Sequence, residues 1–150
     1  MKLPNGIAGF FSSETNEPLS VDGKQFKQLC YHIAIHNEGK VIDFNEPKYP
    51  RKFYYAQVEI LGEQFYILLN GHHPYIAFSS SIGFGNIKFI DKPFISEQFS
   101  LFYKVLGLAD LHVSVDENLI KKTELNIAEL EQLAYWKPET VGQIIFNYWD

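Results

Sequence analysis

The sequence predicts an α+β fold in a single domain spanning residues 1–150, with an antiparallel meander of about four to six strands, an N-terminal helix and a C-terminal helical cluster packed on one face. Three observations favour it. Apolar residues recur with helical spacing before residue 37, β-forming residues fill residues 41–90 between short turns, and helical spacing returns after residue 91. Strands followed by helices are typical of α+β domains.

The first part of the chain predicts a short strand and one helix. Gly6–Phe11 is apolar enough for a strand, and the polar residues 12–18 that follow predict a turn. Asp22 is a favourable N-cap and Gly39 is placed to end the helix, which we expect to run to about His36. The apolar positions of this helix share one face: Phe26, Leu29, Cys30, Ile33 and Ala34.

The middle of the chain predicts consecutive strands joined by short turns. β-branched and aromatic residues dominate each segment, and Gly, Pro and Asn residues separate the segments. Strands with such short links pair antiparallel, which predicts a meander. The predicted strands are Val41–Phe44, Lys52–Leu61, Gln64–Leu69, Tyr75–Ser79 and Asn86–Ile90.

Helical spacing returns in the last part of the chain. A helix that Gly107 is placed to end carries one apolar face, made of Ile95, Phe99, Phe102 and Leu106. Residues 108–122 carry no clear pattern and are expected to form a loop or an irregular turn of helix. A further helix is predicted over residues 127–136, because Asn126 and Glu129 have the spacing of a capping box.

The carboxyl end predicts a final helix that starts near Pro138. A helix this apolar either completes the core or meets a partner, and we expect it to complete the core. Asp150 would place two carboxylates at the negative end of the helix dipole, so a nearby cation is expected, either Arg51 or a lysine of the sheet. The apolar residues form two neighbouring stripes, Val141, Ile144, Ile145 and Tyr148 in one and Phe146 and Trp149 in the other.

The composition argues against several classes of function. A formal charge of −5, with twelve lysines and the single arginine Arg51, argues against a nucleic-acid partner. No apolar run approaches the ~18 residues needed to cross a bilayer, so no membrane partner is expected. The chain shows no signal peptide, and Cys30 is its single cysteine, so we expect a cytoplasmic protein without disulfides.

Acidic residues are concentrated near the carboxyl end. From residue 109 onward there are eight acids and three lysines, which accounts for the whole net charge. Such a stretch is usually a solvated helix face, and alternatively it is a docking surface for a protein partner with a basic surface. The candidate partner-binding residues are Asp110, Asp116, Glu117, Glu124 and Glu131.

Two histidines in a turn provide an alternative site. His72 and His73 lie between two predicted strands, in a position from which a rigid sheet presents side chains to a ligand. With Ser79 and Ser81 they define an alternative pocket, suited to a small-molecule binder or a hydrolase. Turn composition alone explains the pair equally well.

Two further histidines have the spacing of metal ligands. On a helix, His32 and His36 would project from one face, as zinc ligands do. A third ligand, Glu38 or Asp43, would have to be brought near by the fold, so the sequence predicts no metal site and no cofactor. Cys30 lies on the apolar helix face and is expected to be a buried, unreactive thiol.

These features together favour a non-catalytic protein-interaction domain. No Gly-x-Ser-x-Gly, His-Glu-x-x-His or Cys-x-x-Cys motif occurs, and no catalytic residues are predicted. Bacterial immunity proteins, which neutralise a toxin by covering its active site, share this profile of size and charge, although no motif is shared. We therefore expect an immunity-type inhibitor that occludes a basic partner such as a toxin. The oligomeric state is not predicted.

Overall fold

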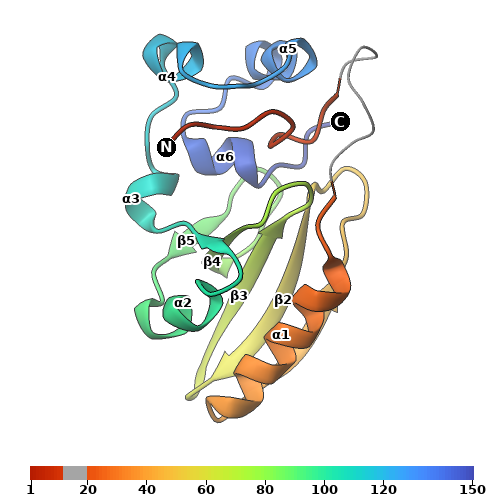
Figure 1. The fold of residues 1–150 in the computed structure, drawn as a ribbon, viewed down its shortest axis with the longest axis vertical. Helices are drawn as coiled ribbons and strands as arrows, with labels where there is room; N and C mark the ends of the chain where they lie inside the picture. The colour runs from red at the N-terminus through yellow and green to blue at the C-terminus, as the bar shows by residue number, and fades with distance from the viewer. Residues whose placement is uncertain (12–19) are drawn as a thin grey trace.

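The computed structural model describes residues 1–11 and 20–150 and confirms the α+β fold (Figure 1). The turn predicted over residues 12–18 lies outside the described residues. In the described part, β1 to β5 form a meander in chain order, and β6 pairs with β4. The strands are β1 (Gly39–Asn45), β2 (Phe53–Ile60), β3 (Glu63–Asn70), β4 (Tyr75–Ser81), β5 (Lys88–Ile90) and β6 (Lys104–Val105). The helices are α1 (Gly23–His36), α2 (Pro93–Phe99), α3 (Leu108–Leu111), α4 (Glu117–Lys121), α5 (Ile127–Trp136) and α6 (Val141–Ile145).

Helix α1 forms as predicted. The side chain of Asp22 accepts a hydrogen bond from the backbone N–H of Gln25 at 3.1 Å and so caps the helix. The helix ends at His36, and Glu38, with φ at +54°, makes the reversal into β1. Gly39 therefore opens β1 and does not end the helix. Its lack of a side chain is required there, because a Cβ would lie 2.2 Å from a backbone oxygen of β2.

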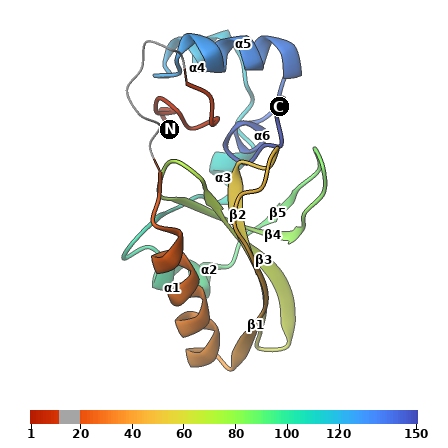
Figure 2. The same ribbon diagram turned by 90° about the vertical axis from the view of Figure 1, so that its right-hand side faces the viewer.

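One face of the sheet packs against α1 and α2 (Figure 2). Alternate side chains of β2, namely Ala56, Val58 and Ile60, point to this face, as the two-residue period of a strand requires. This packing forms the first apolar cluster. Its other main members are Phe26, Cys30, Ile33, Phe65, Ile67, Phe78, Ile95 and Phe99.

The opposite face carries the second apolar cluster. There Phe53, Leu68 and Ala77 of the sheet pack with residues near both chain ends. Figures 1 and 2 show the N-terminal segment and α6 together at one end of the sheet, below α4 and α5. The other main members of this cluster are Leu3, Ile7, Ala8, Leu111, Leu133, Val141, Ile144, Ile145, Phe146 and Trp149.

Gly6–Phe11 does not form the strand that the sequence predicted. The N–H of Gly9 donates to the carbonyl of Gly6 at 3.0 Å, and φ is +86° and +85° at these glycines, so the segment turns. The apolar pattern correctly indicated burial, because Ile7 and Ala8 are fully buried. It did not indicate conformation, because the backbone of this segment pairs with side chains and not with a neighbouring strand.

Helix α2 ends at Phe99, well before the Gly107 that was predicted to end it. The chain then extends as β6 and pairs in parallel with β4, and the N–H of Leu106 donates to the carbonyl of Ile76 at 2.8 Å. This pairing satisfies backbone groups at the sheet edge, which outweighs the helical spacing of the apolar residues. Phe102, assigned to a buried helix face from the sequence, is 55% exposed as a result.

The C-terminal helices agree with the sequence in part. Residues 108–122 hold the short helices α3 and α4, and α5 begins with both hydrogen bonds of the capping box formed by Asn126 and Glu129. The final helix is much shorter than predicted, because α6 ends at Ile145 and residues 146–150 are not helical. No helix in the described ranges is long and apolar enough to cross a membrane.

Candidate functional site

A cavity lies where the C-terminal segment meets the loop between β4 and β5. Its volume is about 450 Å³, within the ~300–1,000 Å³ typical of ligand pockets. Most of its walls come from three stretches of chain, namely the β4–β5 loop with the start of β5, the end of α5 with the turn that follows, and α6 with the residues after it, and His112 after α3 adds a fourth. Its aromatic lining is Phe84, Phe89, Trp136, Phe146, Tyr148 and Trp149, and its polar lining includes His112, Lys137, Glu139, Thr140 and Gln143.

Aromatic rings make the apolar walls of the cavity. The rings of Phe84 and Tyr148 lie 5.0 Å apart between centroids. Trp136 and Trp149 stack within 4° of parallel, with centroids 6.2 Å apart. Such mutual contacts hold the rings in place and give a ligand a preformed surface. Phe84 is nevertheless 71% exposed, so a large apolar side chain faces solvent at the edge of the cavity.

Polar groups beside these walls are also held in place. The N–H of Glu139 donates to Oε1 of Gln143 at 2.6 Å, which joins the turn after α5 to α6. Lys137 ends α5 in a left-handed conformation, with φ at +50°. Burial raises the pKa of Tyr148, while the nearby Arg51 lowers it. The phenol of a tyrosine is neutral at ordinary pH and can donate a hydrogen bond. With exposed His112, these groups are polar side chains and backbone groups that can form hydrogen bonds with a ligand.

Hydrogen bonds hold the carboxyl end of the chain in place, where it forms one wall of the cavity. The carbonyl of Asn147 accepts the N–H of Lys52 at 3.0 Å, and its side-chain oxygen accepts the N–H of Trp149 at 3.0 Å. The ammonium of Lys52 donates to the carbonyl of Trp149. Burial lowers the pKa of Lys52, and the neighbouring Asp150 raises it. Lys52, which the sequence placed in the predicted strand Lys52–Leu61, is therefore a cation close to the terminal residue.

A buried carboxylate holds the N-terminal segment against α5. Glu129 is 0% exposed and accepts the N–H groups of Gly6 and Ala8, both at 2.7 Å, and that of Asn126 at 3.2 Å. Burial raises the pKa of Glu129, while these hydrogen bonds and the nearby His73 lower it. The sequence indicated the capping role of Glu129 but not its bonds to residues more than 120 positions earlier.

The five predicted partner-binding acids lie on or beside α3, α4 and α5. Asp110 accepts a hydrogen bond from the N–H that precedes α3, at 3.3 Å, and Asp116 caps α4 through an N–H at 2.8 Å. Both carboxylates are thus engaged with their own helices. Glu117 and Glu131 are exposed on α4 and α5.

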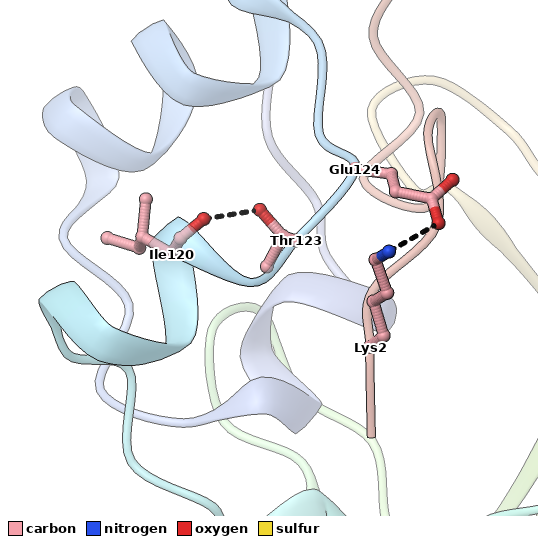
Figure 3. A network of polar contacts seen from close by, with 4 residues as sticks. All are labelled: Lys2, Ile120, Thr123 and Glu124. Atoms are coloured by element: carbon pink, nitrogen blue, oxygen red, sulfur yellow. Dashed lines mark hydrogen bonds and ion pairs between the residues drawn. The ribbon is translucent and has the colours of Figure 1, made fainter.

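The fifth acid, Glu124, pairs with a lysine of the N-terminal segment. Figure 3 shows the ion pair between Glu124 and Lys2, 3.2 Å long, beside the turn that ends α4. In that turn the hydroxyl of Thr123 donates to the carbonyl of Ile120 at 2.8 Å. The charge of Glu124 is therefore partly balanced by Lys2.

The residues of the alternative pocket do not come together. His72 and His73 lie in the turn between β3 and β4, and their rings pack against different aromatic neighbours. Ser79 and Ser81 lie at the far end of β4, roughly 20 Å from His73 at a rise of ~3.3 Å per residue. The cavity described above contains none of these four residues.

The metal-ligand candidates lie on α1, away from the cavity. His32 and His36 are exposed, with ring centroids 4.0 Å apart. Neither Glu38 nor Asp43 joins them, since no three His, Cys, Asp or Glu side chains within residues 1–11 and 20–150 gather as a metal site. Cys30 is fully buried, and burial raises the pKa of its thiol, so the thiol is unreactive.

Comparison of the chain with protein-family models, curated proteins and solved structures found no match. The role of the cavity therefore has to be inferred from its geometry. Sequence reasoning assigned Trp149 to the core, and it did not identify the cavity. The available signal was the placement of both tryptophans of the chain, Trp136 and Trp149, within its last fifteen residues.

Proposed function

We propose that this chain is a non-catalytic protein-interaction domain whose cavity receives an aromatic side chain of the partner. The observation that carries the proposal is the aromatic lining, which continues from the cavity to exposed Phe84 at its edge. Tyr135, 77% exposed, extends the aromatic surface further through its edge contact with Trp136 at 5.2 Å. Pockets lined by tryptophan and tyrosine supply much of the binding energy at protein interfaces.

A protein partner fits this surface better than a ligand confined to the cavity. A ligand enclosed by the walls would contact Phe84 from the cavity side only and leave Tyr135 in water, whereas a protein that covers the edge would bury both side chains. Burying apolar surface contributes roughly 25 cal/mol per Å² before the costs of association are subtracted. A protein partner therefore gains more binding free energy from these aromatic residues than a ligand inside the cavity does.

The more specific form of the proposal is an immunity-type inhibitor that covers a basic toxin. Glu117 and Glu131 are exposed on α4 and α5, at the same end of the molecule as α6 and the C-terminal segment (Figure 1). Carboxylates in such a position attract a basic partner and accelerate encounter, while the aromatic residues supply contact energy. Inhibition would result from steric occlusion.

The first test uses peptides selected from a random library against the full chain. We expect the selected peptides to contain aromatic residues and to change the fluorescence of Trp136 and Trp149, because both line the cavity. Phe84→Ala should weaken binding by about tenfold or more. Phe94→Ala is the matched control, since Phe94 is 63% exposed on α2. Equal binding by wild type and Phe84→Ala, or binding of free indole but of no peptide, would overturn the proposal.

A second test addresses the acidic residues. For a selected peptide with lysines beside its aromatic residue, the double variant Glu117→Lys/Glu131→Lys should slow association by about tenfold at low salt. Glu97→Lys, an exposed change on α2, is the control. An association rate that does not vary with salt would contradict the immunity-type inhibitor. It would not contradict the proposal that the cavity binds an aromatic side chain.

A further inference from the structure

Two histidines on α1 form a pair that the proposed interaction surface does not use. His32 and His36 are one helical turn apart and both are exposed. Their ring centroids lie 4.0 Å apart and the ring planes are inclined by 34°. Residues four apart on a helix face the same direction, so both imidazoles are presented to solvent together.

A hydrogen bond defines the tautomer of the second ring. Nδ1 of His36 lies 2.8 Å from the carbonyl oxygen of His32. Because a carbonyl only accepts, Nδ1 carries the proton, and the lone pair of the neutral ring is on Nε2. Metal-binding histidines commonly have this arrangement, in which one nitrogen donates to a backbone carbonyl and the other binds the ion. Nε2 of His36 is thus the nitrogen that would bind an ion.

We propose that His32 and His36 bind one divalent late transition-metal ion, with copper(II) preferred. Two neutral imidazoles suit copper, nickel and zinc, whereas magnesium and calcium need several oxygen ligands. Among the divalent ions, affinity for nitrogen ligands peaks at copper(II). Since no third His, Cys, Asp or Glu of the described residues joins the pair, water completes the coordination. The site is consequently open and exchangeable, unlike a closed structural zinc site.

The bound ion would stabilise the end of α1. It links two successive turns of the helix just before the chain reverses into β1. An ion that binds only the folded helix raises the melting temperature, and the increase grows with the logarithm of the free ion concentration once that exceeds the Kd. The effect is independent of the cavity, because none of the residues that line the cavity lies on α1.

The test uses the full chain without a histidine tag and copper(II) chloride as the probe. Calorimetry should show one equivalent of copper bound, and electron paramagnetic resonance should show nitrogen ligands. His36→Ala should weaken binding by about tenfold or more, because one ligand then binds without its linked partner. His112→Ala, an exposed change far from α1 in sequence, should leave the affinity unchanged.

A rescue variant separates chelation from binding by one histidine. In His36→Ala/Gln28→His the pair is rebuilt one turn earlier, between exposed position 28 and His32, and affinity should return. Failure of the double variant His32→Ala/His36→Ala to lose copper binding would overturn the proposal. So would a loss of binding that appears only when His112 is replaced. Circular dichroism of each variant, recorded first, verifies that α1 is intact.

Discussion

The two apolar clusters of this domain lie on opposite faces of one sheet and are built in different ways. In the first cluster the side chains come mainly from regular elements, α1, α2 and the strands, whose backbone groups satisfy each other. The second cluster includes two irregular segments, at the N-terminus and after α6. Their backbone groups are held by three buried polar side chains, Glu129, Asn70 and Asn147.

The difference between the two clusters shows what a segment without regular secondary structure needs in order to be buried. Unpaired backbone groups cost free energy away from water, so an irregular segment needs side chains that supply the missing partners. Asn70 does this for two segments at once, because its amide donates to the carbonyls of Ile7 and Ile145, each at 2.8 Å. The cavity borders the second cluster. We therefore expect that cluster, and the candidate site with it, to depend on a few polar residues.

The largest effect is expected from removing the carboxyl end. Deletion of Trp149 and Asp150 should lower the free energy of unfolding by about 4 kcal/mol, as for other buried tryptophans. Trp149 is 7% exposed and stacks on Trp136. Thermal unfolding measures the change, and deletion of Asp150 alone is the control. An unchanged melt with loss of peptide binding would show that this end is a partner surface and not core.

A smaller loss is expected from Glu129→Gln. The amide has one acceptor oxygen in place of two and turns its NH₂ group toward backbone donors, so buried N–H groups lose their partner. We expect a loss of about 3 kcal/mol in chemical unfolding. Hydrogen exchange should accelerate in residues 3–11 but not in α1, because the first cluster does not depend on this carboxylate. Glu131→Gln, exposed on the same helix, should change stability little. Uniform acceleration across both clusters would contradict the comparison.

The first cluster is also the part that the sequence predicted best. The i, i+3, i+4 spacing in α1 and the β-forming residues of β2 and β3 are local signals, and the helix and strands that they predicted are present in the structure. The extent of α2 was wrong because β6 pairs with a strand nearly thirty residues earlier. The predicted length of the final helix was wrong because Asn147 binds the backbone of residues 8 and 149. Neither long-range contact leaves a periodic signal.

The candidate site was less predictable than the fold. Its walls join Phe84 to Trp136 and Tyr148, residues that come close only when the sheet and the C-terminal segment have packed. No spacing along the chain marks such a set. Aromatic excess was visible, but aromatic residues also fill ordinary cores, so composition did not separate the exposed Phe84 from the buried Phe53.

Capping offers a test within the first cluster. Asp22→Ala removes the acceptor for the N–H of Gln25 and should cost about 1 kcal/mol, a typical N-cap loss. Asp22→Asn retains an acceptor oxygen and should cost less. Because α1 also buries an apolar face, the helix should persist in circular dichroism while the unfolding midpoint falls. A loss as large as that of Glu129→Gln would mean that the two clusters depend equally on single polar groups.

The smallest effect, and the one of opposite sign, is expected at Tyr103. Its hydroxyl is buried against the first cluster without a hydrogen-bond partner among the described residues. Tyr103→Phe removes that unsatisfied group and should raise stability at neutral pH by a few tenths to about 1 kcal/mol. Tyr135→Phe, at an exposed position, should change nothing.

The same substitution has a pH dependence with a defined sign. Burial, with smaller contributions from Cys30 and Asp22, raises the pKa of Tyr103 from 10.0 to about 12. The folded chain therefore holds the phenol proton more tightly than the unfolded chain, and the wild type loses stability as the pH rises from 10 toward 12. Tyr103→Phe lacks this loss, so its advantage should widen over that range in urea unfolding. An advantage that stays constant with pH would show that the phenol titrates equally in both states. The hydroxyl of Tyr103 would then be solvated. Both clusters would contain polar groups with partners, and the difference between the two clusters would be smaller.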